Sequence, residues 1–350
     1  MSFSETFDLV PGYRISRVLR GGWQLAGGHG PVARDAVSDD LQAFYDAGVT
    51  TFDCADIYTG VEEMIGDFRA RLRQTRGAEA LARLRVHTKF VPDLDLLPRI
   101  TPADVRRIID RSLQRLRTER LDLVQFHWWD YDQPRHVEAA RALLDLQAQG
   151  KIQLIGGTNF DAAHVREIAA AGVPFATLQV QYSLLDTRPE GAMAEACAAL
   201  GMKLLCYGTL AGGFLSERWL GRPAPTGALE NRSLVKYRLI IEEFGGWDLF
   251  QQLLAVLKRV ADRHGTNLSA VASRHVLDQP HVAGVIVGAR NATHLPATLA
   301  VAQVRLTDAD RAEIAAVLAG RTGPSGEVYA LERDRTGPHG SIMKYNLGDS

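Results

Sequence analysis

Short apolar segments alternate with stretches of helical periodicity along this chain, and this alternation constrains the fold more than any other feature. Near-continuous apolar strands between amphipathic helices are typical of parallel strands that are buried on both faces. Eight such pairs predict a closed (β/α)8 TIM barrel, and an open doubly wound sheet is the alternative. The predicted strands are RVLRGGWQL (17–25), TTFDC (50–54), RVHTKF (85–90), LDLVQFH (121–127), IQLIGGTN (152–159), ATLQVQYS (176–183), KLLCYG (203–208) and AGVIVGA (283–289).

The clearest predicted helix is TPADVRRIIDRSLQRL, residues 101–116. Thr101 suits the N-cap, Pro102 the first helical position and Asp104 the first turn, and apolar residues follow at three- and four-residue steps. The segments 39–49 and 161–173 have the same period, and each reaches a glycine before the next strand. No glycine fingerprint of a dinucleotide-binding open sheet follows the first strand, which favours the barrel.

A chain of 350 residues fits a single barrel domain with insertions, and we expect one domain over residues 1–350. After a short N-terminal extension the barrel is expected at about residues 8–320, followed by a C-terminal tail at 321–350. Residues 211–233, rich in glycine and proline, predict a long loop after the seventh strand. The tail residues Tyr329, Glu332, Arg333 and Tyr345 are candidates to cover a site, although the sequence does not place the tail.

Composition favours a small-molecule or protein partner. The net charge of -1 provides no electrostatic attraction for nucleic acid or an anionic membrane. We expect no signal peptide and no membrane span, because no apolar run approaches the length of about 18 residues that a span needs. Cys54, Cys197 and Cys206 lack paired spacing, which suits the cytoplasm and predicts no metal site with histidine. The sequence contains no heptad pattern, so it does not indicate the oligomeric state.

Polar residues end three consecutive predicted strands: Asp53 the second, Lys89 the third and His127 the fourth, with Tyr58 in the loop after Asp53. The carboxyl ends of barrel strands meet at one mouth, so these side chains should converge there. A buried aspartate needs a cation, and Lys89 is the candidate. We expect Lys89 to lower the pKa of Tyr58 from about 10, which would suit the phenol to general acid–base transfer with a carbonyl oxygen.

Each of these residues alone has a structural explanation. An aspartate at a strand end is often a turn or helix cap, a lysine there is usually solvated, and a lone histidine is more often a satisfied core residue. Their coincidence at the same end of three strands, with a tyrosine beside them, favours an active site.

The sequence resembles the aldo-keto reductase family over nearly its whole length. The resemblance implies a TIM barrel, a nicotinamide cofactor (usually NADPH) bound without a Rossmann domain, and a catalytic tetrad of Asp53, Tyr58, Lys89 and His127. Tyr58 would be the general acid, tuned by Lys89, while His127 would orient the carbonyl. The motifs, in family order, are ISRVLRGGWQL, FDCADIYTGVEEMIG, HTKF, SLQRLRTERLDLVQFHW, IGGTNF, LQVQYSLLDTR, CYGTLAGGFLS and GVIVGARNATHL.

The same resemblance implies contacts for the cofactor and the substrate. Thr158, Asn159 and Gln179 would bind the carboxamide, Tyr207 would stack on the nicotinamide ring, and the segment 208–212 would pass under the pyrophosphate. Trp23 and Trp128 would line the substrate pocket beside Tyr58 and His127, and Trp129 is a further candidate. The full set for the cofactor is Gly22, Trp23, Asp53, Thr158, Asn159, Gln179, Tyr207, Gly208, Thr209, Leu210, Gly212, Gly288, Arg290, His294 and Thr298.

The adenosine segment departs from the family pattern. Ala297 and Thr298 stand where the family has an acid and an amide, and His294 stands where arginine is common. Arg290 remains able to bind a phosphate as a bidentate donor. NADPH is therefore the predicted cofactor, with NADH as the alternative.

The leading hypothesis is an NAD(P)H-dependent oxidoreductase that interconverts the carbonyl and alcohol of a small aldehyde, ketone or sugar-like substrate. Two alternatives stay open: a regulatory or redox-sensing subunit on the same fold with little turnover, and a barrel whose adenosine site no longer binds a cofactor.

Overall fold

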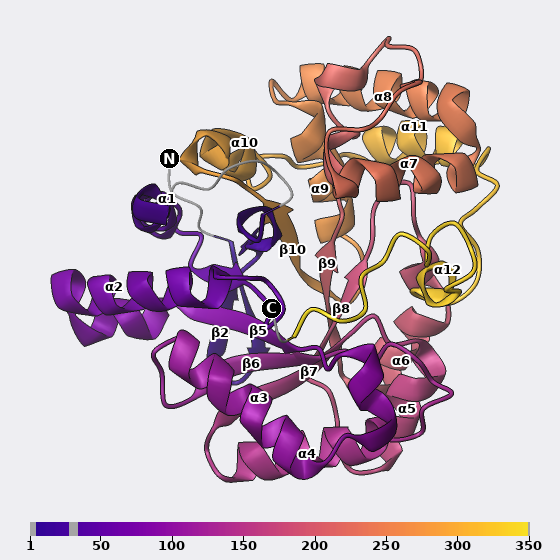
Figure 1. The fold of residues 1–350 in the computed structure, drawn as a ribbon. Helices are drawn as coiled ribbons and strands as arrows, with labels where there is room; N and C mark the ends of the chain where they lie inside the picture. Colours follow the sequence, from indigo (N-terminus) through magenta and orange to yellow (C-terminus); the bar gives the residue numbers. More distant parts are fainter. Residues whose placement is uncertain (1–4, 28–33, 349–350) are drawn as a thin grey trace.

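Eight parallel strands close into a barrel in the computed structural model, which describes residues 5–27 and 34–348 (Figure 1). Around the barrel the strands follow their order in the chain, and β10 closes the ring against β3. The predicted TIM barrel is confirmed, and the open sheet is wrong. The strands are β3 (Val18–Gly21), β4 (Thr51–Asp53), β5 (Arg85–Phe90), β6 (Leu121–Phe126), β7 (Ile152–Thr158), β8 (Thr177–Gln181), β9 (Lys203–Tyr207) and β10 (Val282–Gly288).

Helices surround the barrel, and their ends follow the capping signals of the sequence (Figure 1). Thr101 accepts the backbone N–H of Asp104, whose carboxylate accepts the N–H of Thr101 in return, so both orphan donors are satisfied. Within the predicted segments 39–49 and 161–173, the helices end at Asp46 and Ala170, and Gly48 and Gly172 then adopt the left-handed region at φ +91° and +90°. The helices are α1 (Arg34–Asp46), α2 (Val61–Arg83), α3 (Pro102–Arg115), α4 (His136–Ala148), α5 (Ala162–Ala170), α6 (Ala192–Leu200), α7 (Arg232–Phe244), α8 (Gly246–Arg263), α9 (Leu268–Leu277), α10 (Leu295–Ala300), α11 (Asp308–Leu318) and α12 (Ala330–Arg333).

The first predicted strand was too long at its carboxyl end. β3 stops at Gly21, and Trp23–Leu25 forms a 3-10 turn, η1. The cause is local: the N–H of Gly22 donates to the carbonyl of Asp53 at 2.7 Å, and a Cβ at Gly22 would lie only 2.9 Å from that oxygen. The close approach turns the chain across the mouth and carries Trp23 toward β4.

The N-terminal extension forms an antiparallel hairpin of β1 (Thr6–Val10) and β2 (Tyr13–Ser16). Its apolar side chains pack against apolar residues of the barrel strands β3, β6, β9 and β10, which closes the amino-terminal end. This cluster contains Leu9, Tyr13, Ile15, Leu19, Leu123, Leu205, Ala283 and Ile286.

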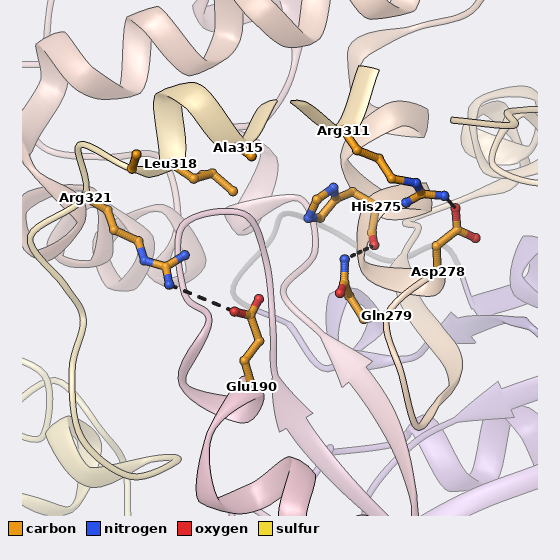
Figure 2. A pocket seen from close by; sticks show the side chains of 9 residues that line it. Glu190, His275, Asp278, Gln279, Arg311, Ala315, Leu318 and Arg321 are labelled. Atoms are coloured by element: carbon orange, nitrogen blue, oxygen red, sulfur yellow. Dashed lines mark hydrogen bonds and ion pairs between the residues drawn. The ribbon is translucent and has the colours of Figure 1, made fainter. Parts of the chain in front are cut away.

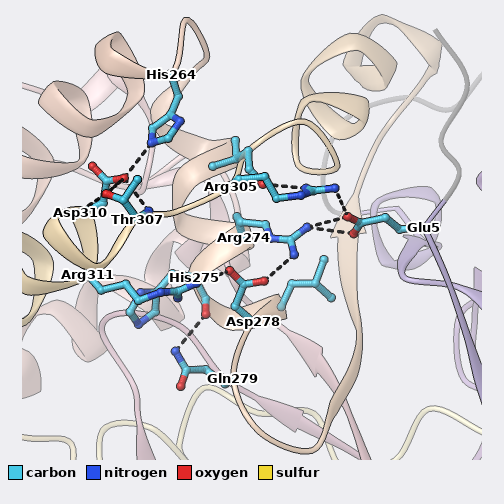
Figure 3. A network of polar contacts seen from close by, with 12 residues as sticks. Glu5, His264, Arg274, His275, Asp278, Gln279, Arg305, Thr307, Asp310 and Arg311 are labelled. Atoms are coloured by element: carbon cyan, nitrogen blue, oxygen red, sulfur yellow. Dashed lines mark hydrogen bonds and ion pairs between the residues drawn. The ribbon is translucent and has the colours of Figure 1, made fainter.

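A polar network fastens the segment before β1 to the outer helices (Figure 3). The carboxylate of Glu5 lies 2.9 Å from Arg274 of α9 and 2.8 Å from Arg305. Arg274 also pairs with Asp278, which lies 2.9 Å from Arg311 of α11. The network therefore links three segments that are far apart in the sequence.

The predicted long loop, 211–233, is mostly irregular, with short 3-10 turns at Ala211–Gly213 (η4) and Glu217–Trp219 (η5) before α7. The C-terminal tail leaves α11, forms α12 and then runs across the carboxyl ends of the strands (Figure 1). Across the described residues, no helix has the length and apolar character needed to cross a membrane.

Candidate active site

The cation that Asp53 requires is Lys89. The Lys89 ammonium lies 2.7 Å from Asp53 Oδ2 and donates to the carbonyl oxygen of Cys54 at 2.8 Å. Both side chains of the pair are at least nine-tenths buried. Burial alone would lower the pKa of Lys89, but the adjacent Asp53 carboxylate outweighs burial and raises that pKa. Lys89 is therefore a permanent cation in the mouth.

Two glutamines complete the coordination of Asp53. Gln125 Nε2 donates to Asp53 Oδ1 at 2.9 Å, and Gln179 Nε2 donates to the same oxygen at 2.6 Å. Gln179 also donates to Gln125 Oε1 at 2.9 Å, so the carboxylate and both amides form one network inside the barrel. Gln179 was predicted as a cofactor ligand, whereas the role of Gln125 had no signal in the sequence beyond its place on a strand.

Tyr58 lies beside this pair. The Lys89 ammonium is 5.1 Å from the centroid of the Tyr58 ring, and the indole of Trp23 packs on the same ring at 5.0 Å. Burial raises the pKa of Tyr58, and Lys89 offsets only part of that rise. The expectation that Lys89 brings the phenol below its ordinary pKa is thus wrong for this structure, because partial burial of Tyr58 raises the pKa by more than the cation lowers it. Tyr58 consequently holds its proton at neutral pH.

His127 is fully enclosed at the end of β6 and keeps one nitrogen for the mouth. Its Nδ1 lies 3.1 Å from the carbonyl oxygen of Thr158, which only accepts hydrogen bonds, so Nδ1 carries the proton. Nε2 has no partner in the described part of the chain. Burial, reinforced by Arg333 and Lys89, lowers the pKa of His127 to about 3. His127 is therefore neutral, with Nε2 as a hydrogen-bond acceptor.

The predicted nicotinamide contacts lie around β7, β8 and β9. Asn159 has a left-handed backbone, with φ +61°, and its N–H donates to the carbonyl of Gln179 at 2.9 Å. Thr158 Oγ1 donates to the same carbonyl at 3.2 Å. The Tyr207 hydroxyl donates to Asn159 Oδ1 at 2.9 Å, which fixes the amide beside the Tyr207 ring. The structure thus brings Thr158, Asn159, Gln179 and Tyr207 together.

The segment predicted to hold the pyrophosphate is covered by α7. Gly208 has φ +77°, and a Cβ there would lie 2.1 Å from the Tyr237 hydroxyl oxygen. At Gly212, with φ +66°, a Cβ would lie 2.8 Å from the same ring. Only glycine fits at both positions. Between them, Thr209 is buried and faces Ser273 Oγ at 3.1 Å, while Leu210 is half-buried.

The predicted adenosine segment follows β10. Its first residue, Gly288, packs against the side chain of Gln24, and Arg290 and His294 are exposed. Thr298 is buried, and its hydroxyl donates to the carbonyl of His294 at 3.0 Å, so it serves the helix start rather than the solvent face. A carboxylate also reaches this segment: Asp40 Oδ1 accepts the N–H of Ala292 at 2.8 Å.

The two tryptophans after His127 point to different places. Trp128 is fully buried, its indole N–H donates to the carbonyls of Asp130 and Gln133, and its ring packs against Phe126. This is core packing, so the prediction that Trp128 lines the substrate pocket is not supported by the structure. Trp129 instead meets His127 edge to face at 4.2 Å between ring centroids, which places Trp129 in the mouth.

The tail lies against the mouth. Tyr329 is buried and its ring lies 5.6 Å from that of His127. Lys236 of α7 lies within 5.8 Å of three ring centroids, those of Tyr207, Tyr237 and Tyr329. Sequence reasoning missed Lys236 altogether, because nothing marks one lysine among the charged residues that follow an irregular loop.

Arg333 anchors the tail beside the nicotinamide contacts. Its guanidinium donates to the backbone carbonyls of Trp129 at 3.0 Å and Asn159 at 2.8 Å. It also lies 3.8 Å from the Tyr131 ring centroid and donates to the Tyr131 hydroxyl. Farther along, Tyr345 packs against Trp129 at 5.1 Å. All four tail candidates of the sequence, Tyr329, Glu332, Arg333 and Tyr345, are thus packed against residues of the mouth or of the loops around it.

A separate cleft of about 790 Å³ lies on the outside of the barrel, between the turn at Glu190, the end of α9 and α11 (Figure 2). Its charged groups are already matched: Arg321 faces Glu190 at 4.0 Å, and Arg311 pairs with Asp278 at 2.9 Å. None of the tetrad lines this cleft. The candidate active site is therefore the mouth of the barrel, where the titratable side chains meet, and not this outer cleft.

Comparison with known proteins identifies the family. The model of the aldo/keto reductase family matches residues 17–319. The NADH-specific methylglyoxal reductase of Escherichia coli is 25% identical over 85% of this chain and 92% of its own length. Flagellar radial spoke protein 5 of Chlamydomonas reinhardtii is 29% identical over 64% of this chain, which spans only about half (49%) of that relative.

Among solved structures, the glycerol dehydrogenase AKR11B4 from Gluconobacter oxydans superposes with a TM-score of 0.76. It is 25% identical, and the match covers 92% of this chain and 98% of that one. A putative 2,5-diketo-D-gluconic acid reductase B, 24% identical, shares the fold with a TM-score of 0.66 over 91% of this chain and 92% of its own. With its barrel, its motifs and the family match over residues 17–319, this chain belongs to the aldo/keto reductase family of NAD(P)H-dependent oxidoreductases.

Proposed function

We propose that this chain interconverts the carbonyl and alcohol of a small organic substrate, with Tyr58 as the general acid and base. The observation that carries the proposal is the buried Asp53–Lys89 pair beside Tyr58. A phenol next to a permanent cation can give up its proton at the moment of reaction, since the ammonium stabilises the phenolate that forms.

The residues around the mouth fit a nicotinamide cofactor. The primary amide of a nicotinamide needs both a donor and an acceptor. Asn159 keeps its side-chain N–H2 and Gln179 keeps its side-chain oxygen, whereas their other amide atoms are engaged with Tyr207, Asp53 and Gln125. Gly208 and Gly212 have positive φ angles and expose backbone without side chains, which suits close approach by a pyrophosphate once the Tyr237 ring that covers them moves aside.

When bound, the reduced cofactor supplies hydride to the carbonyl carbon. Tyr58 donates its phenolic proton to the carbonyl oxygen, and Lys89 stabilises the resulting phenolate while Asp53 holds Lys89 in place. The new hydroxyl group has a single proton, and that proton faces the Tyr58 oxygen from which it came. The ring of His127 carries its proton on Nδ1 and therefore donates no hydrogen bond to the carbonyl. His127 instead positions the substrate oxygen by lying beside it, which modifies the role expected from the family. In the reverse direction the tyrosinate takes the alcohol proton.

The substrate class we propose is an aldehyde, ketone or sugar-like carbonyl compound. Trp23, Trp129 and Tyr329 surround the tetrad with aromatic faces, which suit a compact organic molecule. The sensor alternative rests on the shared fold alone. The test is turnover of a panel of aldehydes and ketones with each reduced cofactor; absence of turnover despite stoichiometric cofactor binding would favour the sensor.

For the cofactor, the sequence-based prediction is NADPH, with Arg290 as the phosphate ligand. One observation favours NADH instead: the Asp40 carboxylate reaches the start of η6 (Ala292–His294), where a 2′-phosphate would meet a negative charge. NADH specificity in the Escherichia coli relative agrees with this alternative. Titration with both cofactors, followed by tryptophan fluorescence, decides between them, and Asp40→Asn should shift the preference toward NADPH if the carboxylate is the cause.

We also propose a cytoplasmic location. Cys54, Cys197 and Cys206 are buried and unpaired, a pattern typical of proteins kept in a reducing compartment.

A further inference from the structure

Two histidines and a glutamate meet on the outside of the barrel, away from the tetrad. His136 is the first residue of α4, and His164 and Glu167 lie one turn apart on α5, the neighbouring helix (Figure 1). One ligating atom from each of the three residues lies within 4.8 Å of the others. We propose that His136, His164 and Glu167 form a binding site for a single divalent transition-metal ion, with Zn²⁺ as its natural occupant.

The donor set suits zinc. Two imidazole nitrogens and one carboxylate oxygen are ligands that Zn²⁺ takes in tetrahedral sites, with the fourth position left to water. Bonds of about 2.0–2.1 Å place tetrahedral ligands roughly 3.3 Å apart. His136 Nε2 and Glu167 Oε2 are already 2.9 Å apart, and the ligating atom of His164 lies within 4.8 Å of both, so adjustment of the side chains without movement of the helices would close the site.

A carboxylate outside the ligand set orients the second histidine. The Nδ1 atom of His164 lies 2.7 and 2.9 Å from the two carboxylate oxygens of Asp161. This contact keeps the proton on Nδ1 and leaves Nε2 as a lone-pair donor. The same carboxylate–histidine pairing accompanies most protein zinc sites, where it fixes the tautomer and raises the basicity of the ligand.

The rings are also held in position before any ion binds. Tyr131 stacks on His164, with ring centroids 3.4 Å apart and an angle of 7° between the planes. The His136 side chain is only 6% exposed, whereas those of His164 and Glu167 are 25% and 52% exposed. The cluster thus has a rigid inner ligand and an outer side that is open to solvent, so an ion can reach it.

The sequence predicts no metal site, because none of its cysteines has the spacing of a metal-binding motif with histidine. His136 lies far from the other two residues in the chain, and only the packing of α4 against α5 brings them together. The proposed ion would tie these helices to each other and, through Tyr131, to the Arg333 anchor of the tail.

The test is zinc binding to tag-free protein that has been stripped with a chelator. Competition against a chromophoric chelator should show one Zn²⁺ per chain, and Co²⁺ in its place should show the visible band of a tetrahedral site. His164→Ala and Glu167→Gln should each weaken binding at least tenfold. Asp161→Asn, which preserves the helix cap, should also weaken it, by about tenfold or more.

His281→Asn is the matched control, since it removes a partly exposed histidine elsewhere on the surface and keeps a residue that tolerates its φ of +66°. Zinc binding to this variant should equal that of the unaltered protein. The proposal is overturned if the unaltered protein binds no stoichiometric Zn²⁺, or if His164→Ala and Glu167→Gln bind it as tightly as the control does. Because the readout is metal binding, these outcomes are independent of whether the mouth reduces carbonyls.

Discussion

Lys236 Nζ of α7 and Glu332 Oε1 of α12 lie 3.5 Å apart at the mouth of the barrel, and the second oxygen of Glu332 lies 3.2 Å from Arg188. The carboxylate is completely enclosed and shared by two cations. Without Glu332, the Lys236 ammonium would lose its carboxylate partner, whereas Arg188 would keep its bidentate contact with Asp186. Together with the Arg333 contacts, this pairing holds the tail against the mouth of the barrel.

Glu332→Ala should destabilise the protein by about 3–5 kcal/mol, because Lys236 would lose its carboxylate partner and Arg188 would keep only Asp186. The measurement is urea unfolding at pH 7. Glu327→Ala, which removes an exposed tail carboxylate, is the control and should cost less than about 1 kcal/mol. Equal losses in the two variants would show that the pairing with Lys236 and Arg188 contributes nothing.

The same carboxylate predicts a pH dependence of stability. Burial would raise the pKa of Glu332, but Lys236 and Arg188 outweigh it and lower the pKa from 4.5 to about 2. A depressed acid pKa stabilises the fold fully above the unfolded value and loses that contribution as pH falls toward 2. The stability gap between the unaltered protein and Glu332→Gln should thus shrink, by about 3 kcal/mol, between pH ~4.5 and ~2.

Tyr58→Phe should lower kcat by about 10²–10⁴-fold, since it removes the general acid without changing the shape of the mouth. The dissociation constant of the reduced cofactor should stay within about twofold of the original. Tyr182→Phe, which deletes a hydroxyl bonded to Glu190, is a control at a position outside the mouth. Full activity in Tyr58→Phe would contradict the mechanism.

Lys89→Met should abolish turnover and cost about 3–5 kcal/mol of stability, because Asp53 would remain buried with only the two glutamine donors. Adding Asp53→Asn should restore most of the stability but none of the activity. The exposed pair Lys258–Asp262 provides a comparison, and Lys258→Met should cost no more than about 0.5 kcal/mol. A double variant as unstable as Lys89→Met would argue against a charge-pair origin.

His127 should contribute no limb to the pH profile of kcat/KM between pH ~5 and ~9, because its pKa of about 3 keeps it neutral. The contribution of His127 to stability should change with pH in the same direction as that of Glu332, because the unfolded histidine gains a proton below about pH 6.5 while the buried ring does not. His127 therefore destabilises the fold progressively from pH ~6.5 down to ~3. A limb near pH 6.5 that disappears in His127→Gln would contradict a neutral ring.

Tyr237→Ala should accelerate cofactor association, because the Tyr237 ring covers Gly208 and Gly212, where the pyrophosphate is expected to bind. Stopped-flow quenching of tryptophan fluorescence gives the rate. Tyr13→Phe, at the far end of the barrel, is a control that should leave the rate unchanged. Slower association in Tyr237→Ala would mean that the ring helps to bind the cofactor instead of blocking it.

The sequence predicted the barrel and the contact of Asp53 with Lys89 beside Tyr58, because both depend on local rules. Strand periodicity located β4, β5 and β6, and the shared polarity of parallel strands then required Asp53, Lys89 and His127 to meet. Trp128 shows the limit of that rule. The parity of a strand does not continue into the loop that follows, and the backbone after His127 turns the indole into the core.

No comparable rule predicts contacts between segments that are far apart in the chain. The packing of helices outside the barrel decides the positions of Lys236, of Glu332 in the tail, and of His136 beside His164. The spacing of residues along the sequence does not indicate this packing. The pKa of Tyr58 also escaped prediction, because the sequence indicates the neighbouring cation but not the depth of burial that opposes it.

The hairpin of β1 and β2 seals the amino-terminal end of the barrel. Because that end of the barrel is closed, the mouth is the opening through which the proposed cofactor and substrate reach Tyr58. Both must therefore enter and leave by the same path, one after the other. The molecule that binds deepest then binds first and leaves last, and this order of binding and release is the same for every carbonyl compound that the mouth accepts.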